Sequence, residues 1–205
     1  MSTRFSLGID LGTTNSAIAL TDPESDHTEV IEVTQIIGPN QIGEKPTLPS
    51  ALYIPHRDEF PENSFPMPWD NGIGDTTIAG HFARDHGALV PDRLITSAKS
   101  WLSNPHIDPR RQSLPWRSDI PDEKLSPFEC SRRYLAHLKN AFLYAGRVQG
   151  QNGDLSETEI VLTVPASFDA VAQNLTAEAA EAAGLGKVTL LEEPQAAFYA
   201  WIAVR

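Results

Sequence analysis

The chain has 205 residues, of which 40% are hydrophobic and 21% charged, so it can bury the core of one large domain or two small ones. Its formal net charge of −11 argues against a general affinity for nucleic acid, because no excess of Lys and Arg exists to neutralise phosphates. The chain has a single cysteine, Cys130, which indicates a reducing compartment. It has no apolar run approaching roughly 20 residues, and its N-terminus lacks a signal-peptide core. These features predict a soluble cytoplasmic protein that does not span a membrane.

Short strands and two proline-rich loops are predicted for the first half of the chain. Alternating apolar residues predict strands at 5–10, 16–22, 29–34, 50–54 and 76–79. Residues 55–75 and 104–121 are rich in proline and polar side chains, which indicates two long loops. Between these loops, we expect helices at 81–89 and 92–102.

Helices and strands alternate in the second half of the sequence. Ser126, Pro127 and Glu129 form a capping box with proline at the first helical position, which predicts a helix ending near Gly146. After it, we expect a strand, a helix, a strand and a helix, at 159–164, 169–183, 187–191 and 195–204. This order predicts an α/β fold, a sheet with covering helices. The last helix is apolar nearly all round, which predicts that it is buried by more protein than this chain supplies.

A turn of small residues follows the first predicted strand, in the sequence Gly8-Ile9-Asp10-Leu11-Gly12-Thr13-Thr14-Asn15-Ser16. The apolar alternation of the strand places Asp10 at the edge of the core. Gly12 allows a ligand to approach the backbone closely, and the N–H groups and hydroxyls of Thr13 and Thr14 suit phosphate oxygens. Asp10 would repel a bare phosphate, which suggests a hydrated divalent cation between the two. A plain β-hairpin explains the same residues equally well.

Four segments, in this order, resemble the DnaK-like 70-kDa heat-shock chaperones of the actin-like ATPase superfamily. They are the turn described above, SAKSWL at 97–102, LTVPASF at 162–168 and EEPQAA at 192–197. The resemblance implies the first lobe of an actin-like (ribonuclease H-like) ATPase domain, with a mixed sheet and covering helices. Residues 1–48 and 126–205 would form its base, and residues 49–125 an inserted α+β subdomain. The long proline-rich loops suggest a divergent branch of the family.

The matching residues imply a site for ATP or ADP with Mg²⁺. Asp10 resembles a carboxylate that holds magnesium through water and helps to place the attacking water. Glu193 resembles a second magnesium-water ligand that accepts a proton, and Lys99 resembles a lysine that reaches the γ-phosphate. The phosphate-binding turn, in which the threonine hydroxyls would donate to the β- and γ-phosphates, would consist of Gly12, Thr13, Thr14 and Asn15.

For each of these roles, the sequence also allows a simpler structural explanation. Asp10 would cap the turn, Lys99 would lie on the solvated face of a helix, and Glu193 would interact with a helix dipole. Pro165 resembles a proline that couples the nucleotide state to substrate binding, yet it also simply ends a strand. Gln173 stands where the family commonly has Arg, which puts a relay that depends on that cation in doubt.

The resemblance implies ATP hydrolysis that drives the binding and release of unfolded client polypeptides, with co-chaperones as further partners. In the family, a second phosphate loop, an adenosine-binding lobe and a peptide-binding domain follow. We therefore expect residues 1–205 alone to bind ATP weakly and to show negligible turnover. Two alternatives stay open: a non-hydrolysing, nucleotide-dependent interaction module, and a sugar kinase or actin-like filament protein of the same superfamily.

Cysteine and histidine do not show the spacing of a metal site. Cys130 and His137 are seven residues apart on one predicted helix, and His81 and His86 are five apart. We assign these four residues to packing or to solvent.

Overall fold

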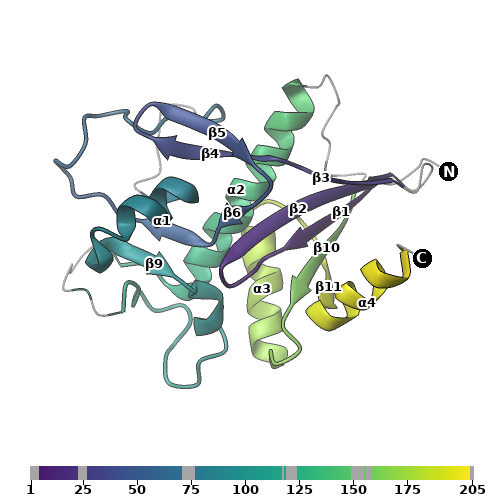
Figure 1. Cartoon of the computed structure of the whole chain (residues 1–205). Helices are drawn as coiled ribbons and strands as arrows, with labels where there is room; N and C mark the ends of the chain where they lie inside the picture. The colour runs from purple at the N-terminus through teal and green to yellow at the C-terminus, as the bar shows by residue number, and fades with distance from the viewer. Residues whose placement is uncertain are drawn as a thin grey trace.

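The fold is a mixed α/β structure built on a six-stranded sheet (Figure 1). The computed structural model describes residues 5–22, 27–70, 77–116, 118, 124–148, 155 and 158–203. The strands of the main sheet are β1 (Ser6–Asp10), β2 (Asn15–Asp22), β3 (His27–Val30), β6 (Leu48–Pro49), β10 (Glu159–Val164) and β11 (Thr189–Glu192). The predicted α/β class with a mixed sheet is confirmed.

The pairing of the main sheet joins the two ends of the chain. Strand β1 runs parallel to β10, with Ile9 beside Leu162, and β10 runs parallel to β11, with Val164 beside Glu192. Strand β2 is antiparallel to β1, β3 and β6. Because β1, β10 and β11 are parallel, their carboxyl ends lie at the same edge of the sheet.

Two helices, α2 (Pro127–Val148) and α3 (Ala170–Ala182), cover one face of the main sheet. The alternation of β1 and β10 turns Leu7, Ile9 and Leu162 towards these helices, where they are buried with Leu135 and Ala179 in one core cluster. On β1, the intervening positions, Gly8 and Asp10, are exposed. The sheet therefore has one apolar, covered face and one polar, accessible edge at the end of β1.

Helix α2 begins as the sequence predicts but ends later. The hydroxyl of Ser126 accepts a hydrogen bond from the backbone N–H of Glu129 at 3.0 Å, which is the first half of a capping box. The carboxylate of Glu129 instead accepts hydrogen bonds from Arg132 and Arg133, one turn further along the helix. The predicted end near Gly146 is wrong, because the helix passes through this glycine to Val148.

The middle of the sequence forms a second, smaller sheet. Strands β8 (Ile78–Ala79), β7 (Ala51–Tyr53) and β9 (Leu94–Thr96) pair in that order, and helix α1 (His81–Gly87) packs on β7. The hairpin of β4 (Val33–Gly38) and β5 (Gln41–Lys45) contributes Ile36 to the same apolar cluster as Tyr53 and Phe82. The division of the chain into a base and an inserted subdomain stays a prediction.

The predicted helix at 92–102 is wrong. Its residues form a 3₁₀ turn η1 (Pro91–Arg93), strand β9 and a second 3₁₀ helix η2 (Ala98–Trp101). Pairing with β7, which places Ile95 beside Leu52, overrides the helical periodicity. The chain then turns at Ser97, which has a left-handed φ of 55°.

Several smaller sequence predictions also need correction. The strand expected at 29–34 is divided between β3 and β4, and strands β5 and β6 lie in a segment for which no strand was expected. The strand expected at 76–79 is β8, and residue 76 lies outside the described residues. Residues 55–70 and the described part of 104–121 contain no helix, and their only pairing is the isolated bridge between Leu114 and Leu125. The remaining parts of these two loops are outside the described residues.

The last helix, α4 (Glu193–Ala203), forms at the predicted place but starts two residues earlier and is not buried. Its exposed apolar side chains are Phe198, Tyr199, Trp201 and Ile202. Figure 1 shows α4 following β11 directly, beside the sheet. None of the helices among the described residues is long and apolar enough to cross a membrane.

His137 on α2 is a partly buried histidine that is tied to the β4–β5 hairpin. Its Nε2 lies 2.9 Å from the carbonyl oxygen of Thr34 and therefore donates to it, and Trp69 packs edge-on against the ring. Burial lowers the pKa of His137 to about 4, although the hydrogen bond to the carbonyl opposes this shift. The imidazole is thus neutral in the folded protein at neutral pH.

We expect the free energy of unfolding to fall as the pH drops from about 6.5 to about 4, because the unfolded chain then binds a proton at His137 that the folded chain does not. The contribution is about 2–3 kcal/mol. Chemical denaturation at several pH values checks this, with His137→Gln as the comparison, because glutamine can donate to Thr34 but does not titrate. If the two proteins lost stability in parallel over this range, the assignment to His137 would be wrong.

Candidate functional site

Asp10 and Thr163 meet at the carboxyl edge of the main sheet. The hydroxyl of Thr163, on β10, donates to Oδ1 of Asp10, at the end of β1, at 2.6 Å. Asp10 is exposed, as the alternation of its strand predicts. Sequence reasoning missed Thr163, because only the parallel pairing of β1 with β10 makes the two residues neighbours.

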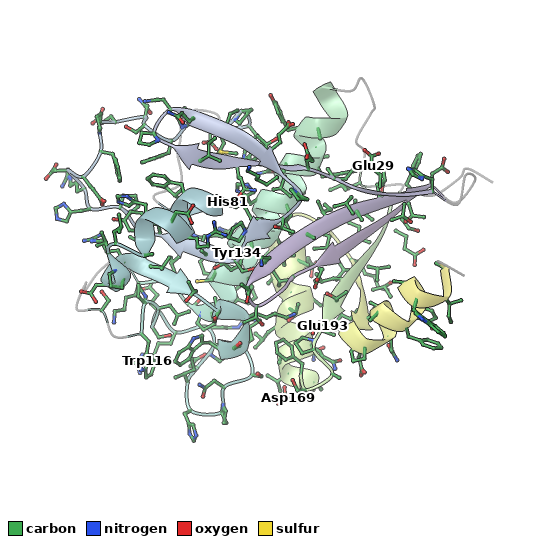
Figure 2. The ribbon with its side chains drawn as sticks, viewed as in Figure 1. Glu29, His81, Trp116, Tyr134, Asp169 and Glu193 are labelled. Atoms are coloured by element: carbon green, nitrogen blue, oxygen red, sulfur yellow. The ribbon has the colours of Figure 1, made fainter. Side chains whose placement is uncertain are left out.

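Lys99 and Glu193 meet across 94 residues of sequence. The Nζ atom of Lys99, on η2, donates to Oε1 of Glu193, at the first turn of α4, at 2.5 Å. The side chain of Lys99 is 3% exposed and that of Glu193 is 44% exposed. Lys99 therefore does not lie on a solvated helix face, as the simpler explanation held. Figure 2 shows Glu193 at the start of α4, near the middle of the molecule.

The surroundings of Lys99 explain how a cation is tolerated in a nearly buried position. Its Nζ lies 5.9 Å from the ring centroid of Phe168, which is buried after the end of β10. A buried ammonium group is costly unless a carboxylate or a similar partner accepts from it. Glu193, whose own side chain is 44% exposed, supplies that partner.

The turn between β1 and β2 exposes the residues that the sequence singled out. Thr13, Thr14 and Asn15 are all exposed. A Cβ added to Gly12 would lie 2.1 Å from the backbone oxygen of Asn15, so no other residue fits this turn without moving the backbone. The close approach of two backbone segments, and not a positive φ, accounts for the glycine.

Two buried serines that sequence reasoning missed support this turn from behind. The hydroxyl of Ser50 donates to the carbonyl of Gly12 at 2.7 Å, and its backbone N–H donates to the carbonyl of Thr14 at 2.8 Å. The hydroxyl of Ser16 lies 2.9 Å from that of Ser50. The available signal was weak: two serines among strand residues, 34 positions apart.

The sequence of the chain is similar to those of several chaperone proteins. No family model matches the chain. It is 29% identical over 210 residues to a chaperone protein HscA homolog of Mannheimia succiniciproducens, and 31% identical over 198 residues to the chaperone protein DnaK of Thermotoga petrophila. These alignments cover 97% and 96% of the chain. The chain belongs to the DnaK-like chaperone family. The DnaK-like chain spans 29% and 26% of the length of these two relatives.

The segment after β10 contains Pro165, and the helix that follows it contains Gln173, which stands where the resemblance led us to expect Arg. Strand β10 ends at Val164, directly before Pro165, as predicted. The side-chain amide of Gln173, on α3, donates to the carbonyl of Phe168 at 3.1 Å. Gln173 therefore supports the turn that carries Phe168. The coupling role of Pro165 stays a prediction.

The described residues of the DnaK-like chain include two carboxylates that could serve as oxygen ligands for a cation. Within the described ranges, no group of three or more His, Cys, Asp and Glu side chains could hold a metal ion. Asp10 and Glu193 are both exposed carboxylates, each with one described partner, Thr163 and Lys99. Such carboxylates suit Mg²⁺, which keeps several of its waters when it binds to proteins.

A large cavity of the DnaK-like chain lies elsewhere. It has a volume of about 730 Å³ and is lined by the 55–70 loop, by β8 and by α2, and it includes Phe60, Trp69 and Arg133. None of the predicted site residues lines it. The edge of the main sheet is the better candidate site, because the chemically suited side chains converge there.

Proposed function

We propose that this DnaK-like chain is the ATP-binding lobe of a molecular chaperone whose complete form hydrolyses ATP to drive the binding and release of client polypeptides. The observation that carries the proposal is the contact between Lys99 and Glu193, which brings a cation and a carboxylate together from opposite parts of the chain. Their position supports it further, because the carboxyl ends of parallel strands are where α/β sheets bind their ligands.

In the proposed mechanism, the turn from Gly12 to Asn15 binds the β- and γ-phosphates through backbone N–H groups and the hydroxyls of Thr13 and Thr14. Lys99 stabilises the negative charge on the γ-phosphoryl group as it is transferred. When bound, Mg²⁺ supplies further neutralisation of phosphate charge, and Asp10 and Glu193 would hold it through water.

Glu193 is proposed to accept the proton of the attacking water. The water oxygen forms a bond to the γ-phosphorus, the bond from this phosphorus to the bridging oxygen of the β-phosphate breaks, and ADP leaves. Lys99 holds the carboxylate of Glu193 in place through the 2.5 Å hydrogen bond. Thr163 fixes the rotamer of Asp10 in the same way, so both carboxylates are oriented before ATP binds.

The proposed organisation follows from the same contacts. Residues 1–48 and 126–205 would form the base of an actin-like lobe, and residues 49–125 its inserted subdomain. The separate small sheet of β7, β8 and β9 supports this division. Lys99 would then reach from the inserted subdomain to Glu193 of the base. Clients and co-chaperones would bind to parts of the protein beyond this lobe.

Measurement of phosphate release from ATP by the full-length protein tests the proposal. We expect slow hydrolysis that requires Mg²⁺ and stops when EDTA removes it, because the two carboxylates would otherwise face the phosphates directly. ATP binding in calorimetry without phosphate release would favour a non-hydrolysing interaction module. Phosphorylation of a small sugar would favour a kinase, and the absence of ATP binding would overturn the proposal.

A further inference from the structure

We infer that Ser50 is a positioning residue that holds the turn between β1 and β2 in the conformation that binds phosphate. The inference rests on the proposed function. Ser50 makes two hydrogen bonds to the turn, one from its hydroxyl to the carbonyl of Gly12 at 2.7 Å and one from its N–H to the carbonyl of Thr14 at 2.8 Å. Both of its donors are thus used on the same short segment.

These two hydrogen bonds also fix the directions of two N–H groups. In a trans peptide, the N–H of the next residue points opposite to the carbonyl. Because the carbonyls of Gly12 and Thr14 point towards Ser50, the N–H groups of Thr13 and Asn15 point away from it. Two donors are thereby directed away from the buried serine, and such arrays of N–H groups bind phosphate oxygens.

The hydrogen bonds of Ser50 are protected from water. Ser50 is 4% exposed and Ser16 is fully buried. Since the hydrogen of the Ser50 hydroxyl is donated to Gly12, the Ser16 hydroxyl must be the donor in the 2.9 Å contact between the two side chains. Ser16 therefore fixes the orientation of the Ser50 hydroxyl, which makes a chain of hydrogen bonds that ends at the turn.

The place of Ser50 in the fold links the turn to the rest of the molecule. It lies between β6, which pairs with β2 of the main sheet, and β7, which belongs to the small sheet. The turn is therefore attached to the segment that connects the two sheets. The side chain of Ser50 contacts the turn through the backbone carbonyl of Gly12. We therefore expect Ser50 to act on phosphate binding through the conformation of the turn.

Ser50→Ala in the full-length protein tests the inference. We expect the affinities for ATP and ADP, measured by calorimetry, to fall by at least about tenfold, because the turn loses a hydrogen bond to its backbone. The affinity for adenosine should change by less than about twofold, because the turn would contact only phosphates. Ser50→Thr, which retains a hydroxyl, should recover most of the loss.

Ser64→Ala is the matched control. Ser64 is also 4% exposed, and its hydroxyl donates to the carbonyl of Pro61 at 2.6 Å in the 55–70 loop, so the change removes a similar buried hydrogen bond. Its ATP affinity should equal that of the wild type. If Ser50→Ala does not fold, Ser16→Ala decides instead, and a loss of ATP affinity with unchanged adenosine affinity is then expected.

The outcomes separate this inference from the proposed function. A wild-type protein without ATP affinity would overturn both. A wild type that binds ATP, together with a Ser50→Ala protein that binds it equally well, would overturn only the inference. A parallel loss of ATP and adenosine affinity would show that Ser50 is merely structural, which also contradicts the inference.

Discussion

Replacing Lys99 by methionine is expected to lower the rate of ATP hydrolysis by the full-length protein at least about a hundredfold. The change removes the ammonium group but keeps an unbranched apolar side chain in a site that is 3% exposed. The loss should appear in the turnover number measured at saturating ATP, because in the proposed mechanism the cation stabilises charge that develops during phosphoryl transfer. Nucleotide affinity should change much less.

Glu193→Gln provides the second half of this test. It should also lower turnover by orders of magnitude, because an amide does not accept the proton of the attacking water. Lys139→Met is the control. Lys139 is a partly buried lysine on α2, and its ammonium group lies near Gly184, just after the end of α3. Unchanged turnover in both site variants would show that neither Lys99 nor Glu193 takes part in catalysis.

Gly12→Ala is expected to weaken ATP binding by about a hundredfold or more, because the added Cβ would lie 2.1 Å from the backbone oxygen of Asn15. The added Cβ is fixed by the backbone of residue 12, and the oxygen belongs to the backbone of Asn15, so no side-chain rotation can relieve the contact. The turn must open, and its N–H groups then lose their common direction. Calorimetric titration with ATP measures the effect.

Gly38→Ala is the control for this substitution. A Cβ at Gly38 would lie 3.3 Å from the end of the Gln41 side chain, which can rotate away. Gly38 lies in the β4–β5 hairpin, away from the turn, so its substitution should leave ATP affinity unchanged. Equal affinities of the wild type and Gly12→Ala would exclude this turn from the nucleotide site.

Local patterns in the sequence were sufficient to predict most elements of the main sheet. The alternation around Leu7 and Ile9 predicts β1, and the serine before Pro127 predicts the start of α2. Both signals act within a few residues and do not depend on the rest of the fold. The helix expected at 92–102 failed because Leu94–Thr96 pair with β7, a contact with residues more than 40 positions earlier.

The candidate site shows the same limit more sharply. Asp10 and the turn after it are local features, and the resemblance to DnaK-like chaperones added Lys99 and Glu193. The partners of these residues are not local. Thr163 reaches Asp10 only through the strand order, and Ser50 reaches Gly12 only because β6 pairs with β2. Periodicity carries no information on such pairings, so the supporting residues could not be found before the structure.

The parallel pairing of β1 with β10 constrains how the protein folds during its synthesis. Ser6 lies beside Glu159, so β1 lacks this neighbour until about 150 further residues have been translated. At roughly 5–20 residues per second, this delay lasts about 8–30 s. The hairpin of β1 and β2 can form as soon as both strands are synthesised. The contact of Lys99 with Glu193 can form only after Glu193 has left the ribosome. The nascent chain therefore displays an unpaired strand edge for many seconds, and the contact between Lys99 and Glu193 forms only after this delay.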